Sequence, residues 1–136
     1  MTRETAIKTA AKWWADKLRS RAPHSNGDNA LSSVFACMLA DIGTEEATED
    51  KLAVFTSELE HQIREHMDNV NGRYVWLGSD YGPCTMLGES ADEAGINRLN
   101  FPFKTDMNIE QSSGYEYMIR VSDGYGQPWK NLDPCE

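Results

Sequence analysis

The stretch RYVWLGSDYGPCTML, residues 73–87, decides the fold, because the hydrophobic period changes there from that of helices to that of strands. Residues 73–79 alternate between two sets of side chains, as a strand does: Tyr74, Trp76 and Gly78 on one side, Val75, Leu77 and Ser79 on the other. Residues 80–83 form a turn, and Pro83 suits the first position of a helix, where its missing N–H needs no partner. We therefore expect a short helix from Cys84 to Ala94 that Gly95 ends.

Upstream of this stretch, residues 1–69 have the period of amphipathic helices. We predict a first helix from about Thr5 to Arg21, a second over residues 28–42 and a third that ends near Asn69. Hydrophobic residues recur at helical spacing in each: Ile7, Ala10, Ala11, Trp14 and Leu18 in the first, Leu31, Val34, Phe35, Met38, Leu39 and Ile42 in the second, Leu52, Phe55, Leu59, Ile63 and Met67 in the third.

Downstream, two β-like runs follow, DMNIEQ at residues 106–111 and YEYMIRV at residues 115–121. Ser-Ser-Gly separates them, a length that favours a hairpin. Residues 122–136 are rich in turn residues, and we expect an irregular tail. The sequence therefore predicts a single α+β domain over residues 1–136. Three N-terminal helices pack on a small, mainly antiparallel sheet of about three strands, and a short helix follows the first strand.

Charge narrows the class of partner. The 136 residues carry 22 acidic and 13 basic side chains, a formal net charge of −9. Such a surface repels nucleic acid and anionic lipid, so we expect a basic protein partner, no direct binding of nucleic acid and no membrane attachment. The N-terminus lacks the apolar segment of a signal peptide, and no hydrophobic run approaches the ~18 residues of a membrane span. Three cysteines without metal-ligand spacing indicate reduced thiols, which favours a cytoplasmic protein.

The charge is distributed unevenly along the chain. Residues 1–22 hold six basic and two acidic side chains, whereas residues 41–69 hold nine acidic and two basic ones. Part of the polar side of the third predicted helix is an acidic row: Asp50, Glu58, Glu65 and Asp68. Such a row is usually a solvated face. The alternative is a docking surface for a basic groove that otherwise holds phosphates, and we take the row as a candidate partner-binding surface.

Aromatic residues beyond those of the predicted core are a second candidate. Trp and Tyr are enriched in protein interfaces. The sequence therefore singles out Trp13, Tyr125 and Trp129 as candidate partner-binding residues, with Tyr115 and Tyr117 as further surplus aromatics. The alternative is that these side chains pack the tail against the core.

Cys84 raises the possibility of covalent catalysis, because a helix N-terminus stabilises a thiolate. Asp80, Tyr81 and Lys104 come near it if residues 101–105 fold back over the turn, so these three form a possible ligand turn. An obvious general base is missing, since the second half of the chain contains no histidine. A Cys–His pair needs His24, His61 or His66 brought in by the fold. We interpret the turn as structural and assign no catalytic residue. A small, hydrolytic enzyme acting at residues 80–84 is the alternative.

Metal and cofactor chemistry have no sequence signature here. His61 and His66 are five residues apart, so on a helix they point in directions about 140° apart and cannot share one ion. The chain has no P-loop and no glycine-rich dinucleotide motif. We expect neither a metal site nor a cofactor.

Three segments, AAKWWADKLRS, SDYGPCTML and AGINRLNFPFKTDMNI, resemble in order and spacing a group of small proteins of bacteria, their phages and mobile elements. The resemblance spans Ala10 to about Tyr125, and the loose pattern is WWA, GD, DYGP, FP-aromatic-KT and GYG. The matching residues are Trp13, Trp14, Gly27, Asp28, Asp80, Tyr81, Gly82, Pro83, Phe101, Pro102, Phe103, Lys104, Thr105, Met107, Gly124, Tyr125 and Gly126. The chain departs from the group at Cys84, where an acidic or small residue is typical, which argues against a thiol mechanism.

The resemblance bears on function by category. Small, acidic, phage-associated proteins include inhibitors of bacterial defence systems, anti-CRISPR proteins among them. We predict a non-enzymatic, acidic, protein-binding inhibitor from a phage or mobile element that docks on a basic, nucleic-acid-handling target such as a CRISPR effector. A housekeeping binding protein is a further alternative.

Overall fold

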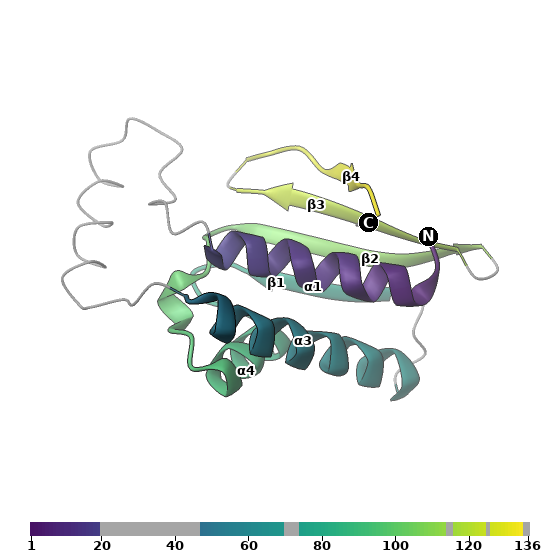
Figure 1. Cartoon of the computed structure of the whole chain (residues 1–136). Helices are drawn as coiled ribbons and strands as arrows, with labels where there is room; N and C mark the ends of the chain where they lie inside the picture. The colour runs from purple at the N-terminus through teal and green to yellow at the C-terminus, as the bar shows by residue number, and fades with distance from the viewer. Residues whose placement is uncertain (20–46, 70–73, 114–115, 125, 135–136) are drawn as a thin grey trace.

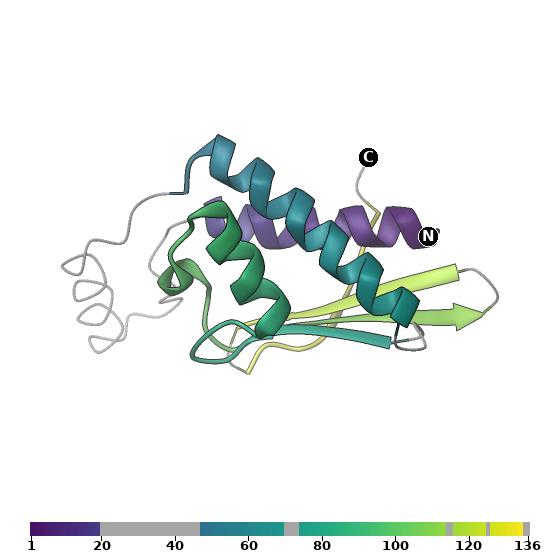
Figure 2. The ribbon, with the colours of Figure 1, turned by 90° about the horizontal axis from the view of Figure 1, so that it is seen from below.

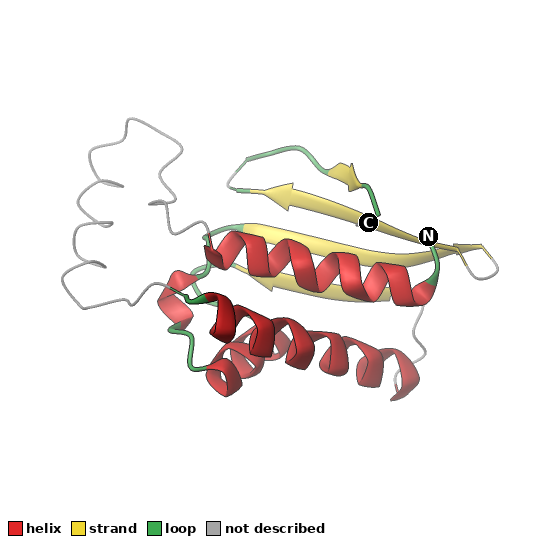
Figure 3. Cartoon of the chain, in the orientation of Figure 1, coloured by secondary structure: helices red, strands yellow, loops and turns green. Residues whose placement is uncertain are grey.

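The computed structural model describes residues 1–19, 47–69, 74–113, 116–124 and 126–134 (Figure 1). Along the chain these residues form α1 (Arg3–Arg19), α3 (Glu49–Asn69), β1 (Tyr74–Ser79), α4 (Thr85–Ala94), the 3-10 helix η1 (Arg98–Asn100), β2 (Thr105–Ser113), β3 (Glu116–Asp123) and β4 (Lys130–Leu132). Helices and strands occupy separate layers, so the architecture is α+β (Figure 3). The predicted helix over residues 28–42 lies outside the described residues.

The sheet is antiparallel throughout its described part. Its strand order is β1-β2-β3-β4, so β1 forms one edge. β2 and β3 are the predicted hairpin, with an irregularity in their ladder between Gln111 and Ser113. Figures 1 and 2 show α1, α3 and α4 together on one side of the sheet. The opposite side faces away from all three helices.

The core lies between the helices and one face of the sheet. The sheet contributes every second residue of its three long strands, each at most 1% exposed: Val75, Leu77, Met107, Ile109, Ile119 and Val121. The hydrophobic stripes predicted for the first and third helices are all buried, which confirms their faces. Phe101, after η1, fills the space between Trp14 of α1 and Phe55 of α3, with ring centroids 6.2 and 6.0 Å away.

The ends of α4 differ in how well the sequence predicts them. Gly95 ends the helix with a left-handed φ of 72°, as expected. Pro83 was expected at the first helical position, but Cys84 is the N-cap and Thr85 the first helical residue. The reason is a backbone bridge between Ser79 and Pro83, which holds the proline extended and delays the helix by two residues.

Alanine at Gly95 lowers the free energy of unfolding by about 1 kcal/mol, because a side chain at a left-handed φ costs roughly that much. Gly82→Ala is the matched control, since its added Cβ meets nothing within 4 Å, and it changes the free energy of unfolding by less than about 0.5 kcal/mol. Urea denaturation followed by circular dichroism measures both. Equal losses contradict the assignment of Gly95 as a left-handed cap.

The sheet has four strands where the sequence predicts about three, and the segment predicted as an irregular tail begins inside one of them. β3 runs to Asp123, and residues 130–132 pair with residues 119–121 as β4. Three residues are too few to show a period-2 pattern. Pairing with β3, a contact between residues about ten positions apart, therefore decides that this segment is a strand.

Candidate protein-binding surface

No helix in the described part of the chain covers the second face of the sheet (Figure 2). Seven side chains project there at alternate positions of three strands, and we call them the open face: Tyr74, Trp76, Asp106, Asn108, Glu110, Met118 and Arg120. Tyr74 is 51% exposed and Trp76 is 45% exposed. Two neighbouring exposed aromatic side chains on a regular sheet are typical of a binding surface.

Hydrogen bonds hold both aromatic side chains across the neighbouring strand. The Tyr74 hydroxyl donates to Asn108 Oδ1 at 2.7 Å, and the Trp76 indole Nε1–H donates to Asp106 Oδ1 at 3.2 Å. In each case the acceptor is the diagonal neighbour on β2, two residues from the direct partner. Both rings therefore lean in the same direction, with their polar atoms engaged and their ring surfaces left for a partner.

Gly78 makes room for the indole of Trp76. A Cβ at this position would lie 2.2 Å from Trp76 Cζ2 and 2.7 Å from Asp106 Oδ1. The indole therefore rests directly on the backbone of its own strand. This contact and the bond to Asp106 fix the ring before any partner arrives, which lowers the entropy cost of binding.

The charges of the open face are two carboxylates and one guanidinium. Arg120 Nη2 lies 2.9 Å from Glu110 Oε1, so this pair is neutral. Asp106 accepts the indole N–H and pairs with no described cation. The open face thus presents one net negative charge beside an aromatic ring, an arrangement that favours a cationic side chain.

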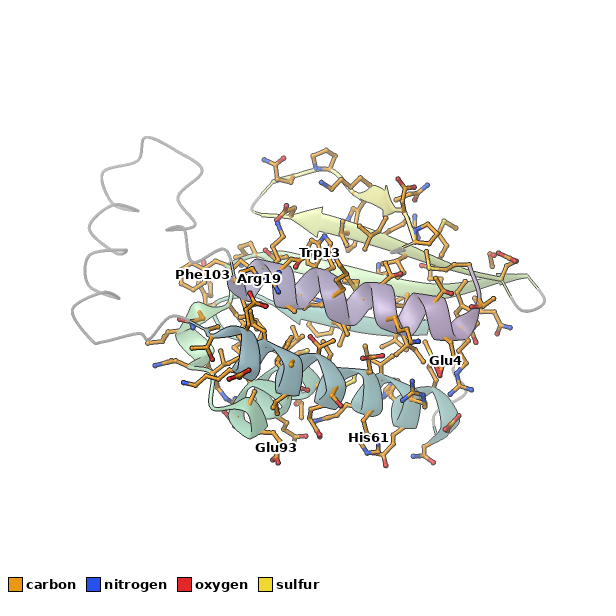
Figure 4. All side chains as sticks on the ribbon, viewed as in Figure 1. Glu4, Trp13, Arg19, His61, Glu93 and Phe103 are labelled. Atoms are coloured by element: carbon orange, nitrogen blue, oxygen red, sulfur yellow. The ribbon has the colours of Figure 1, made fainter. Side chains whose placement is uncertain are left out.

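The structure divides the acidic row predicted on α3. Arg3 Nη2 lies 2.5 Å from Asp68 Oδ1, so Asp68 is used to join α1 to α3. Glu65 lies 3.4 Å from His61 Nε2, on the outer side of α3 where Figure 4 shows His61. Asp50 and Glu58 form no ion pair with a described residue. One member of the row thus pairs with α1, another lies near His61 of the same helix, and Asp50 and Glu58 have no described ionic partner. The role of the row in binding stays a prediction.

The unevenly distributed charges of the sequence form ion pairs between α1 and α3. Besides the pair of Asp68, Arg64 Nη2 lies 3.0 Å from Glu4 Oε1 and Arg19 Nε lies 2.7 Å from Glu49 Oε1. Glu4 and Arg19 stand near opposite ends of α1 (Figure 4), so the pairs link the two antiparallel helices at both ends. The hydrogen bond from Arg64 lowers the pKa of Glu4, and that from Arg19 lowers the pKa of Glu49.

These pKa shifts predict a loss of stability in acid. Both carboxyl groups have a pKa lowered from its ordinary value in the folded protein, so their contribution is present above the unfolded pKa and disappears as the pH falls through the folded pKa. Glu4→Gln should therefore reduce the loss of stability between about pH 5 and about pH 3. Glu93→Gln, an exposed change on α4, is the control. Urea denaturation at both pH values measures the effect, and an equal acid loss in wild type and Glu4→Gln contradicts it.

The structure places the aromatic residues singled out from the sequence in different surroundings. Trp13 is half-buried against Trp14, with centroids 5.0 Å apart, and Lys17 Nζ lies 4.9 Å above its ring. Trp129 is 48% exposed beside β4. Tyr117 packs against the core. Tyr125 and Tyr115 lie outside the described residues. The binding roles of Trp13, Tyr125 and Trp129 stay predictions.

The possible ligand turn forms as a cluster, because residues 101–105 do fold back over residues 80–83. The Lys104 ammonium pairs with the Asp80 carboxylate and lies 4.5 Å above the ring of Tyr81. The Lys104 N–H also donates to the Asp80 carbonyl at 2.9 Å. These contacts hold Lys104 at a left-handed φ of 54°, rare for a residue with a side chain. Since acid and base neutralise each other, we interpret the cluster as a clamp, and ligand binding and enzymatic chemistry there stay predictions.

Cys84 contributes backbone rather than side chain to the start of α4. Its N–H donates to the Gly78 carbonyl at 2.8 Å, and its side chain makes no capping hydrogen bond. The thiol is half-buried against the core. In the part of the chain that the structure describes, no group of three His, Cys, Asp or Glu side chains is placed to hold a metal ion.

Sequence reasoning did not single out Tyr74 and Trp76 as candidate binding residues. Their alternation against Val75 and Leu77 was visible, but both sides of the strand are apolar, so the pattern alone does not show which side the helices cover. The available signal was Gly78 two residues after Trp76, since an indole can rest on a strand glycine.

Among the described helices, none is long and apolar enough to span a membrane. Comparison with known proteins adds no family to this geometry: no protein-family model matches the chain, and no curated protein matches it either.

Proposed function

We propose that this protein is a non-enzymatic binding protein whose open face docks on a basic protein. The observation that carries the proposal is the exposed pair Tyr74 and Trp76, which hydrogen bonds hold beside the carboxylate of Asp106. Trp and Tyr dominate the energetics of interfaces because each buries about 150–250 Å² with few rotatable bonds. Here the rings are already fixed, so little ordering cost remains.

The chemistry of the face selects a cation from the partner. A guanidinium or ammonium above the indole of Trp76 gains a cation–π interaction of about 0.5–2 kcal/mol, and the carboxylate of Asp106 is adjacent. The net charge of −9 attracts a basic partner from a distance. Arginine satisfies both contacts best, because its planar group stacks on a ring and donates to a carboxylate at once.

The finer proposal concerns the identity of the target. A groove that normally holds nucleic acid is lined with arginine and lysine side chains that neutralise phosphates, and an acidic protein that fills it excludes the nucleic acid. We therefore propose a cytoplasmic inhibitor from a phage or mobile element, acting on a nucleic-acid-handling protein such as a CRISPR effector. The resemblance to phage and mobile-element proteins and the acidic composition support it.

Affinity capture from host lysate tests the proposal. Wild-type bait should retain a basic, nucleic-acid-binding protein that salt elutes, and bait carrying Tyr74→Ser and Trp76→Ser should lose it. The captured protein is then assayed for nucleic-acid binding with and without added wild-type protein. Retention of the same protein by both baits, or nucleic-acid binding that the wild-type protein does not reduce, overturns the proposal.

The remaining acidic row on α3 predicts a separate effect on association rate. Asp50→Lys with Glu58→Lys should slow association with the captured partner at low salt, because these carboxylates steer encounter. Glu89→Lys with Glu93→Lys on α4 is matched in charge change and should slow it less. The difference should vanish at about 1 M salt, where the screening length is about 3 Å. Stopped-flow kinetics measure it, and equal slowing by both pairs contradicts a role for the row itself.

A further inference from the structure

β1 is an edge strand without the protection that exposed edges usually carry. No described strand pairs with its outer side. Its sequence, YVWLGS, contains no charged residue and no proline, and its pairing with β2 runs from residue 74 to residue 79 without a bulge. Exposed edge strands normally carry a charged residue, a proline or a bulge, because these prevent their unpaired backbone groups from recruiting other strands.

The backbone groups that face outward belong to the same residues as the exposed aromatic side chains. The Gly78 carbonyl accepts a hydrogen bond from the Cys84 N–H at 2.8 Å, so it points away from β2. Direction alternates along an antiparallel strand with a period of two. The N–H and C=O groups of Tyr74 and Trp76 therefore also point outward, where no described strand meets them.

Beyond Trp76 the edge is closed by the chain itself. The Cys84 N–H donates a hydrogen bond to the carbonyl of Gly78, and Pro83 forms a β-bridge with Ser79. The open part of the edge is thus limited to the backbone groups of Tyr74 and Trp76. On an added strand, they can pair with two residues that are themselves two positions apart. An added strand there is short, and its side chains on the open face lie beside Tyr74 and Trp76 with Cβ atoms about 4.5–5.5 Å away.

We propose that an extended, basic segment of the partner adds to β1 as an antiparallel strand, with two arginine or lysine side chains at alternate positions opposite Tyr74 and Trp76. This inference rests on the function proposed above and specifies how the same face binds. Main-chain hydrogen bonds supply affinity, as in other cases of strand addition. Charge complementarity identifies the occupant: the cations lie beside the two rings and near Asp106, whereas a second copy of this chain brings another net charge of −9.

The pairing geometry provides a sharp test with a matched control. Residues opposite Tyr74 and Trp76 donate their own N–H groups to β1, while the residues between them point their N–H groups away. The probe is a capped peptide, Arg-Val-Arg-Val-Arg. N-methylation of its arginines removes the donors and should weaken binding at least about tenfold. N-methylation of its valines leaves the donors intact and should leave affinity unchanged.

Two readouts separate the outcomes. Tryptophan fluorescence gives the affinity, and NMR-detected hydrogen exchange reports whether the N–H groups of Tyr74 and Trp76 slow when the unmodified peptide binds. Equal affinity of all three peptides, or binding without slower exchange at Tyr74 and Trp76, overturns strand addition while leaving the open face as the docking surface. Peptide affinity unchanged by Trp76→Ala overturns the open face itself. Slow exchange at both residues in a peptide-free dimer, detected by sedimentation, also overturns the proposal, in favour of self-pairing.

Discussion

Phe101→Ala should lower the free energy of unfolding by about 3–5 kcal/mol, the largest effect expected from a single change in this chain. Phe101 is 1% exposed and contacts two helices that are far apart in the sequence. Its ring lies between Trp14 of α1 and Phe55 of α3. Truncation removes buried area and leaves a cavity that three separate elements would have to close. Since small domains have about 5–15 kcal/mol of stability in total, this loss is a large fraction of it, and the variant should unfold at a clearly lower temperature than the wild type.

Phe103→Ala is the control for this prediction. Phe103 is only two residues away but half-buried, and its ring centroid lies 6.1 Å from that of the exposed Tyr81. Its loss should cost well under half as much, because less area leaves water when the protein folds. Urea denaturation measures both variants. Similar losses would show that Phe101 does not hold the helices together. Phe101→Leu should recover most of the stability.

Trp76→Ala should weaken binding of the partner by about a hundredfold or more while the protein stays folded. A buried tryptophan at the centre of an interface contributes about 2–4 kcal/mol, and a hundredfold corresponds to about 2.7 kcal/mol. Trp76 projects from the open face and is absent from the core, so its removal leaves the packing between sheet and helices intact. Biolayer interferometry against the captured partner gives the affinity, and circular dichroism confirms the fold.

Two further variants sharpen this result. Leu99→Ala removes a 39% exposed hydrophobic side chain outside the open face and should leave affinity unchanged. Gly78→Ala keeps the tryptophan but forces its indole to move, because the new Cβ would lie 2.2 Å from Cζ2, so it should weaken binding. Full affinity of Trp76→Ala, or equal losses in Trp76→Ala and Leu99→Ala, would disprove the open face as the docking surface.

The sequence predicts most of what depends on near neighbours in the chain. Helices α1 and α3, the hairpin of β2 and β3, and the glycine that ends α4 follow from periodicity and capping, because residues within about four positions determine these features. The proximity of Asp80 and Lys104 was also foreseeable, since residues 101–105 follow the short helix that starts at the turn. The position of Pro83 was not, because its bridge with Ser79 replaced the helical conformation.

What this sequence determined by itself is a set of amphipathic surfaces: a buried stripe on each described helix, an alternating strand at residues 74–79 and an excess of acid. Only the tertiary structure decided how those surfaces are used. It paired residues 130–132 with β3, consumed Asp68 in an ion pair with Arg3, and turned Tyr74 and Trp76 rather than Val75 and Leu77 toward solvent. For the orientation of β1, the physical reason is that both of its sides are apolar. The side that the helices cover is selected by packing against residues far away in the chain, and local periodicity carries no information about it.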